Sequence, residues 1–306
     1  MTRWSGDGAP AELGSAAAFL RRCRVSREAE TTAMVGSSTR RGILFLGVSL
    51  VGLLTIGCNW FIESQVFFPE KTMTHTPATV RLPYEDIRFA TSDGESLHGW
   101  LVLAHPVRHL LIHCHGNAGN ISHRVDILKG FHDAGVSVFM FDYRGYGESS
   151  GRISEKGFYL DAEAAGRIAR EQADRYGAKL IVSGHSLGGI AAVHIGATER
   201  CDGVVLESTF TNMGAMARAH YLLPALERWL KDRLNATEEI GRLRAPVIFF
   251  HGDRDEIVPI ELGRQLYALA PEPKEFVVLP GAGHNDTYWV GGNLYFVKLR
   301  EFLSRL

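Results

Sequence analysis

The sequence predicts an α/β protein whose mostly parallel central sheet is covered by helices on both faces. Two observations support this fold class. Short apolar runs alternate with longer helical stretches, the pattern of a parallel sheet with crossover helices. In addition, the run Leu180-Ile181-Val182 leads into Gly184-His185-Ser186-Leu187-Gly188, and a small-residue helical stretch follows. Strand, tight turn and helix in this order place a serine at the edge of the sheet where such folds bind ligands.

Each expected element follows from its own pattern. Two apolar runs between Ile87 and Ala104, separated by Ser92-Asp93-Gly94-Glu95, predict a hairpin-like pair of strands. Runs rich in Val, Ile, Leu and Phe predict further strands near 109–115, 136–142, 179–184, 203–207, 246–251 and 275–279. Helices are expected between them, near 121–134, 156–176, 187–199, 260–269 and 287–305.

The 306 residues suffice for one large domain with an N-terminal appendage. We expect the domain to span 67–306. The first segment, 1–41, is rich in Ala, Ser and Arg without sustained apolar periodicity, which predicts disorder; alternatively, translation starts at Met34 and the extension is misassigned. The segment 210–243, the longest between two strands, is amphipathic. It forms either a small helical cap over the ligand site or a helix pair packed on the body.

A charge-free stretch from Gly42 to Ile62 precedes the domain. About 20 apolar residues are enough to cross a bilayer as a helix, and a core helix of that length would show a polar face. Arginines precede the stretch and Glu63 follows it, so we expect a transmembrane anchor with the domain on the extracytoplasmic side, periplasmic or lumenal. A second interpretation is a lipoprotein signal, because Thr55-Ile56-Gly57-Cys58 resembles an imperfect cleavage box in which Cys58 is acylated.

Ser186 is the candidate nucleophile. It lies at the apex of the strand–turn–helix motif, where flanking glycines allow a turn too tight for a Cβ. The plainer interpretation is a glycine-rich turn without chemistry. A serine hydroxyl is a poor nucleophile, so it needs a base within hydrogen-bond reach and an acid that orients the base.

The orienting acid is expected after a later strand. The apolar run Val247–Phe250 leads into a polar turn that contains Asp253, Asp255 and Glu256, and Asp255 is the candidate acid. Asp253 is the first alternative, and its plainer interpretation is a turn-forming residue that bonds its own backbone. Glu207, which follows the preceding strand, and Glu256 are weaker alternatives.

The next apolar run, Phe276–Leu279, ends in a glycine-rich loop that carries the candidate base, His284. Two backbone N–H groups are expected to form an oxyanion hole. One belongs to Leu187, at a helix start where the dipole favours negative charge. The other belongs to Asn117, in the loop after an earlier strand. The plainer interpretation of that loop is a turn in which Asn120 caps the next helix.

Five features in this order resemble the α/β-hydrolase superfamily: Ser186, Asp255, His284, His115-Gly116-Asn117 and the segment Phe141–Ser149. The similarity runs from about Phe67 to the C-terminus, and it is greatest to small membrane-anchored hydrolase-domain proteins with little or no lid. The resemblance implies the α/β-hydrolase fold, a serine-hydrolase mechanism, and no metal or organic cofactor. The turn Asp142–Gly145 resembles a family feature that shapes the loop beside the site, and no chemistry is assigned to it.

Together these features predict a membrane-tethered serine hydrolase, of the carboxylesterase or thioesterase kind, that acts on a small-molecule or lipid-like acyl substrate. A catalytically silent binding protein of the same fold is the alternative, and within the enzymes a peptidase or a lipase remains open. The 33 Lys and Arg residues nearly balance the 34 Asp and Glu residues, which gives no footprint for nucleic acid.

Overall fold

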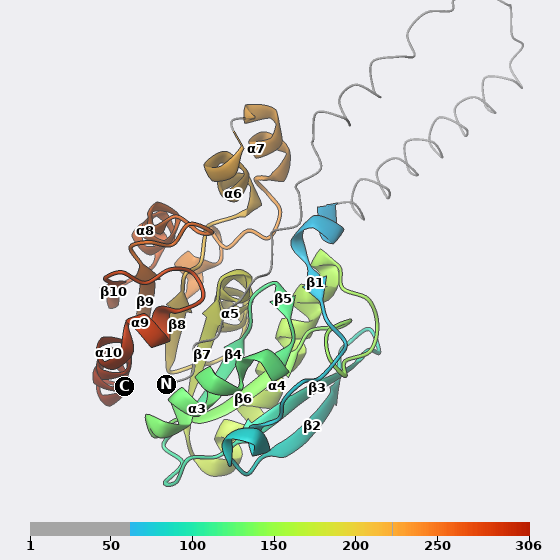
Figure 1. Cartoon of the computed structure of the whole chain (residues 1–306), viewed down its shortest axis with the longest axis vertical. Helices are drawn as coiled ribbons and strands as arrows, with labels where there is room; N and C mark the ends of the chain where they lie inside the picture. Colours follow the sequence, from blue (N-terminus) through green and yellow to red (C-terminus); the bar gives the residue numbers. More distant parts are fainter. Residues whose placement is uncertain (1–61, 222) are drawn as a thin grey trace, which may run out of the picture. The chain divides into compact units, whose positions relative to one another are not determined.

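The computed structural model of the protein describes residues 62–221 and 223–306 (Figure 1). The predicted extension 1–41, and all of the predicted anchor 42–62 except its last residue, lie outside the described residues. Within the two described ranges, no helix is long and apolar enough to cross a membrane. The anchor and the lipoprotein signal therefore stay predictions.

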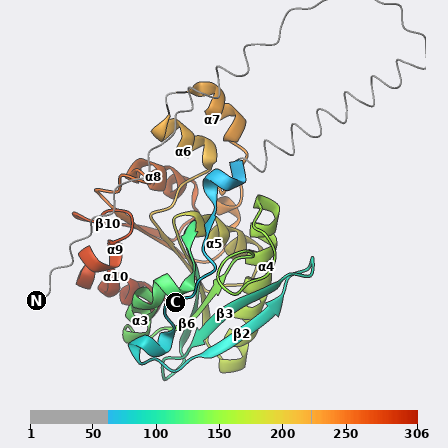
Figure 2. The ribbon, with the colours of Figure 1, turned by 45° about the vertical axis from the view of Figure 1, so that its right-hand side comes forward.

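The main sheet confirms the predicted mostly parallel arrangement. Its strands are β2 Glu85–Ala90, β3 Ser96–Val102, β4 His109–Cys114, β6 Ser137–Asp142, β7 Lys179–His185, β8 Gly203–Glu207, β9 Val247–Gly252 and β10 Lys274–Leu279. Among the described residues they lie in the order β10-β9-β8-β7-β4-β6-β3-β2. Strand β3 is antiparallel to both of its neighbours, and the other adjacent pairs are parallel. Figure 2 shows the β2–β3 hairpin at one edge of the sheet.

Helices cover both faces of the sheet, as predicted. The α-helices of the body are α3 Val125–Asp133, α4 Glu155–Tyr176, α5 Leu187–Thr198, α8 Ile260–Leu269, α9 Thr287–Val290 and α10 Gly292–Ser304. Leu110 and Ile112 of β4 pack in the core that includes α4, α5 and α8, whereas Leu111 packs in the core that includes α3 and α10. This alternation follows from the two-residue period of a strand and gives the sheet a buried surface on each face.

Two expected helices differ in detail from the structure. The stretch near 121–134 opens with a 3₁₀ turn, Ile121–Arg124, before α3 begins. The stretch near 287–305 is divided into α9 and α10, because Gly292 has a φ of 45°, outside the right-handed helical region. Apolar periodicity does not report such a break, since apolar residues continue on both sides of it.

The longest excursion between strands carries the helices α6 Met213–His220 and α7 Pro224–Leu230 and the 3₁₀ turn Ile240–Arg242. Both α-helices stand apart from the two helical layers, beside α8 (Figures 1 and 2). His220 Nε2 donates a hydrogen bond to the carbonyl of Ile257, at 2.8 Å. The excursion therefore touches the loop that follows β9.

A second, small sheet joins the first described residues to the body. It pairs β1 Phe68–Pro69 in parallel with β5 Ala118–Gly119. Strand β5 belongs to the loop after β4, so the first residues of the domain lie directly against that loop. A further 3₁₀ turn, Pro77–Val80, follows before β2.

Candidate active site

The turn between β7 and α5 holds Ser186 in a strained conformation. Its φ is 55° and its ψ is −122°, a region that a residue with a Cβ rarely adopts. A Cβ at Gly184 would lie less than 3.0 Å from the carbonyl oxygen of Gly188, and one at Gly188 would come as close to the carbonyl oxygen of Cys114. Both glycines of the pentapeptide are therefore required by packing.

Backbone and side-chain hydrogen bonds hold this turn in place. The N–H of Ser186 donates to the carbonyl of Glu207, at 2.9 Å. Its own carbonyl accepts from the hydroxyl of Thr209 at 2.8 Å and from the N–H of Gly189 at 2.9 Å. Strained residues persist only where their surroundings fix them, and this strain accordingly marks Ser186 as a candidate functional residue.

Asp255 and His284 meet although they come from different loops. Asp255 follows β9, His284 follows β10, and both residues are buried. His284 Nδ1 lies 2.8 Å from Asp255 Oδ2. With Nδ1 donating to a carboxylate, Nε2 is the ring nitrogen able to take up a proton.

The Asp255 carboxylate has further partners. Its Oδ1 accepts hydrogen bonds from the N–H groups of Ile257 and Val258, at 3.0 and 2.7 Å. His251 Nε2 lies 3.5 Å from Oδ2 and donates to the carbonyl of Val258 at 2.8 Å. Burial pushes the pKa of Asp255 up, but the imidazoles of His251 and His284 outweigh burial and lower the pKa below its ordinary value. Asp255 is therefore an anion held in place by several donors.

The alternatives in the same turn have other positions. Asp253 Oδ1 accepts the N–H of Gly281 at 2.6 Å, so this exposed carboxylate braces the loop after β10. Glu256 is exposed to solvent. In the described part of the chain, the carboxylate hydrogen-bonded to His284 is that of Asp255.

Glu207, at the end of β8, is buried and has other hydrogen-bond partners than this pair. It accepts hydrogen bonds from the hydroxyl of Thr287 and, at 3.0 Å, from that of Tyr295. Burial raises the pKa of Glu207, and these two hydroxyls only partly offset the effect. Its contacts are those of a structural carboxyl that ties β8 to α9 and α10.

His185 connects the two halves of the site, a contact that sequence reasoning did not find. Its Nε2 donates to the carbonyl of His284 at 2.8 Å, and the two imidazole centroids are 4.8 Å apart. Burial, and then the neighbouring His284, hold the pKa of His185 well below its usual value, so the ring is neutral. The residue before Ser186 thereby fixes the loop that carries His284. No local signal reveals this, because the variable position of the pentapeptide accepts many residue types.

The loop after β4 lies against the turn of Ser186. A Cβ placed on Gly116 would be 3.5 Å from the Cβ of Ser186. Asn117 uses its side-chain amide to bond the carbonyl of Val66 at 3.0 Å, and its carbonyl accepts from the N–H of Phe68 at 2.9 Å. Neither bond uses the N–H of Asn117.

Leu187 is the first residue of α5, and the first N–H groups of a helix have no partner within it. The loops that carry Asn117, Ser186, Asp255 and His284 follow the parallel strands β4, β7, β9 and β10, so all of them lie at the carboxyl edge of one sheet. This is the edge at which open α/β sheets bind ligands.

Comparison with known proteins identifies the family. Residues 105–237 match a family model described as serine aminopeptidase, S33. The alpha/beta hydrolase domain-containing protein WAV2 of Arabidopsis thaliana is 31% identical over 298 residues, covering 86% of this chain and 92% of WAV2. The chain belongs to the α/β-hydrolase superfamily. The resemblance stated from its motifs is thus confirmed.

Another relative covers most of the chain. Protein Rv2307c of Mycobacterium tuberculosis is 36% identical over 263 residues, which cover 84% of this α/β-hydrolase and 94% of the relative. Among solved structures, the Pyrococcus furiosus esterase Pf2001 superposes with a TM-score of 0.64 at 22% identity, covering 78% of this chain and 98% of the esterase. At that identity, the likeness shows a shared fold.

Proposed function

We propose that this α/β-hydrolase is a serine hydrolase that cleaves ester or thioester bonds of a small-molecule or lipid-like acyl substrate. Ser186 is the nucleophile, His284 the general base and Asp255 the orienting acid. One observation carries the proposal: His284 accepts a hydrogen bond from His185, beside the strained serine, at its carbonyl and is held by Asp255 through a 2.8 Å hydrogen bond at its ring.

In the acylation step, Ser186 Oγ attacks the carbonyl carbon of the substrate and transfers its proton to His284 Nε2. Asp255 stabilises the imidazolium that forms. The carbonyl oxygen becomes an oxyanion that accepts hydrogen bonds from the N–H groups of Leu187 and Asn117. The C–O or C–S bond then breaks, and the leaving alcohol or thiol takes the proton from His284.

Deacylation repeats these steps with water. His284 takes a proton from water, and the hydroxide that forms attacks the acyl group on Ser186. A second tetrahedral intermediate uses the same two N–H groups. Its collapse releases the acid and returns the proton to Ser186, so the cycle needs no other co-reactant.

A fluorophosphonate probe tests the assignment of the nucleophile. We expect the wild-type chain to be labelled on Ser186 and Ser186→Ala to stay unlabelled. Asp255→Asn should lower the kcat for p-nitrophenyl acetate by about 10⁴-fold, because the wrong imidazole tautomer then faces the serine. Labelling that persists in Ser186→Ala contradicts the proposal. A wild type that neither labels nor turns over esters and thioesters favours the silent binding protein.

A peptidase is the second candidate, because the family model that matches 105–237 is described as serine aminopeptidase. A peptidase that trims chain ends needs a charged group to anchor a terminus. Aminoacyl p-nitroanilides compared with p-nitrophenyl acetate and an acyl-thioester separate the two activities. A higher kcat/KM for the anilides would replace the esterase proposal.

The proposed hydrolase acts at a membrane, on the extracytoplasmic side. The support is the sequence from Gly42 to Ile62, which has no charge and is preceded by arginines. The form of the tether has two alternatives, an uncleaved helix and an acylated Cys58. The mass of the mature N-terminus distinguishes them, because cleavage at Cys58 removes everything before it.

A further inference from the structure

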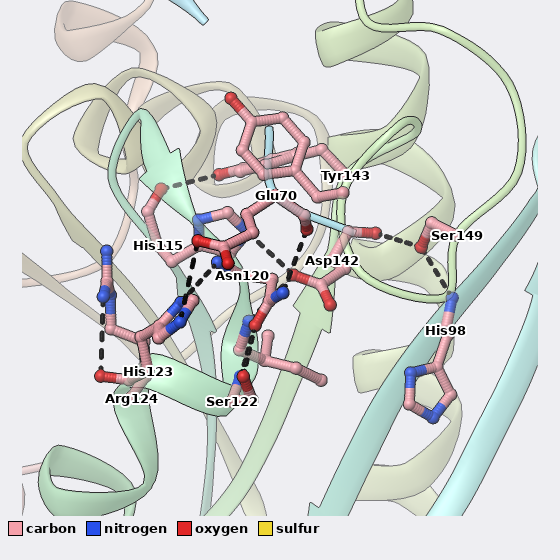
Figure 3. A network of polar contacts seen from close by, with 12 residues as sticks. Glu70, His98, His115, Asn120, Ser122, His123, Arg124, Asp142, Tyr143 and Ser149 are labelled. Carbon is pink, nitrogen blue, oxygen red and sulfur yellow. Dashed lines mark hydrogen bonds and ion pairs between the residues drawn. The ribbon is translucent and has the colours of Figure 1, made fainter. Parts of the chain in front are cut away.

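A buried polar pair lies beside the proposed site, between the loop after β4 and the end of β6 (Figure 3). His115 and Asp142 are both fully buried, and His115 Nε2 lies 3.3 Å from Asp142 Oδ1, an ion-pair contact that does not meet hydrogen-bond geometry. His115 Nδ1 lies 2.7 Å from the carbonyl oxygen of Gly116. A carbonyl oxygen only accepts, so Nδ1 carries a proton and donates it.

That carbonyl and the N–H of Asn117 belong to the same peptide group. A trans peptide is planar, and its C=O and N–H point in opposite directions. By holding the carbonyl of Gly116, the ring of His115 therefore sets the direction of the Asn117 N–H. This hydrogen bond matters at Gly116 because glycine has no Cβ, and the adjoining peptide plane could otherwise rotate freely.

His115 is itself fixed from several sides. Asp142 Oδ1 accepts the N–H of Ile121 at 2.9 Å, which immobilises the carboxylate that faces the ring. The hydroxyl of Tyr143 donates to the carbonyl of His115 at 3.3 Å. The rings of Tyr143 and Tyr146 lie 4.7 and 5.3 Å from the imidazole, centroid to centroid. The ring thus has little freedom to turn away from the loop.

Burying this pair costs free energy, so stability alone does not explain why the two residues are present. Within the described residues, neither His115 Nε2 nor Asp142 Oδ2 has a hydrogen-bond partner, although both atoms are buried. Burying a carboxylate whose oxygens are not all satisfied costs free energy, and a packed apolar pair of similar volume is often as stable or more stable. An ionisable pair kept under these conditions points to a role other than packing.

We propose that His115 and Asp142 are positioning residues for the oxyanion donor of Asn117, a role that rests on the proposed serine-hydrolase function. His115 aims the N–H through the Gly116 carbonyl, and Asp142 holds the ring in the orientation that does so. Tyr146 also holds the loop, because its hydroxyl donates to the carbonyl of Asn117 at 2.7 Å. The segment that begins at Asp142, to which the sequence assigned no chemistry, thereby acts on the reaction through the loop.

Two substitutions of His115 separate its two nitrogens. The amide nitrogen of Asn can take the place of Nδ1, whereas that of Gln reaches the place of Nε2. His115→Gln should lower kcat for p-nitrophenyl acetate by about 30- to 100-fold with KM within about twofold, since an oxyanion donor acts in the transition state. His115→Asn should restore kcat to within about fivefold of wild type, and Asp142→Asn should lower it about tenfold.

A matched control is His98, another buried histidine whose Nε2 lies 2.8 Å from a carboxylate oxygen, that of Asp86. It belongs to β3 and does not bond the Asn117 loop, so His98→Gln should keep the wild-type kcat. All variants are made in the full chain. Each is measured for kcat, KM, rate of fluorophosphonate labelling and thermal unfolding.

The outcomes are distinct. If His115→Gln keeps the wild-type kcat, or if the Asn and Gln variants lose equal activity, the positioning role is wrong. If His115→Gln does not fold, Asp142→Asn decides: a kcat equal to that of His98→Gln overturns the proposal, and a loss of kcat at constant KM supports it. A wild type that is inert to both probe and ester overturns the proposed function instead, before any variant is compared.

Discussion

Ser186 can be held at a positive φ because Gly184 and Gly188, two positions before and after it, let the backbone of neighbouring elements approach closely. Gly188 lies against the carbonyl of Cys114, and Gly184 against that of Gly188. The position of the serine is thus set by backbone contacts between β4, β7 and α5. The side chain itself contributes little to the geometry of the turn.

Gly188→Ala should prevent normal folding of the turn. The added methyl meets backbone, which cannot move aside as a flexible side chain does, so we expect a loss of about 3 kcal/mol or more in the free energy of unfolding. Urea unfolding of the purified variant measures this loss. Gly241→Ala is the control, because a Cβ there meets nothing within 4 Å. Equal stability of the two variants would contradict the packing argument.

Glu207 gives a prediction about pH. Its pKa is raised in the folded state, so the protonated form is favoured there. This contribution is complete below the unfolded pKa of about 4.3 and is lost as pH rises through the higher folded value. Glu207→Gln imitates the protonated form, and its stability relative to wild type should therefore increase as pH rises from 4 to 8. A difference in unfolding free energy that does not vary with pH would show that burial does not shift this carboxyl.

The candidate catalytic residues could be predicted from the sequence, but the residues that hold them in place could not. Ser186, Asp255 and His284 each follow an apolar run, and their order along the chain matches a known arrangement. The hydrogen bond from His185 to the carbonyl of His284 joins residues 99 positions apart. The contact between His251 and the carboxylate of Asp255 could not be predicted from the sequence either. Contacts of this kind depend on how loops meet, which local patterns do not encode.

At the scale of elements, one arginine joins the hairpin, the loop after β6 and a helix. Arg144 Nε donates to Asp161 of α4 at 2.8 Å, and its terminal nitrogens donate to Asp93, in the turn of the β2–β3 hairpin, at 2.7 and 2.9 Å. The guanidinium is nearly buried. Its planar fork satisfies two carboxylates at once, which a lysine cannot do.

Arg144→Lys should therefore reduce the free energy of unfolding by about 2–4 kcal/mol, because the buried carboxylate of Asp161 loses its guanidinium partner and keeps only the backbone N–H of residue 144. Thermal and urea unfolding report the change. Arg88→Lys is the matched control: its ion pair with Glu148 is exposed, and we expect a change of less than about 0.5 kcal/mol. If the two variants lose the same free energy of unfolding, the hydrogen bonds of Arg144 to Asp93 and Asp161 do not stabilise the fold.

Periodicity predicted the elements well because most strands of the main sheet are buried on both faces. It failed where a helix is interrupted without a change of polarity. The break between α9 and α10 depends on the φ of one glycine, and the 3₁₀ turn before α3 depends on the side chain of Asn120, which accepts the N–H of Ser122. The predicted capping role of Asn120 is thus seen in the structure, one turn ahead of α3.

At the scale of the whole molecule, the proposed tether is the property that can be measured most directly. The full chain should sediment with membranes and resist carbonate extraction. Leu50→Arg together with Leu54→Arg should move it to the soluble fraction, since each arginine in a spanning helix costs about 2.5–3.5 kcal/mol. Leu294→Arg with Val297→Arg, at exposed sites of α10, should leave it on the membrane. Wild type that is released by carbonate would disprove a spanning anchor.

The small sheet of β1 and β5 has a consequence for how this hydrolase is held. A few residues after the proposed anchor, the chain forms hydrogen bonds with Asn117. The side-chain amide of Asn117 donates to the carbonyl of Val66, and the carbonyl of Asn117 accepts the N–H of Phe68. The segment that connects the proposed anchor to the domain therefore also holds the loop that carries Asn117. A chain that starts at residue 62 keeps these hydrogen bonds, whereas one that starts after Pro69 loses them together with the buried Phe67 and should have a lower kcat.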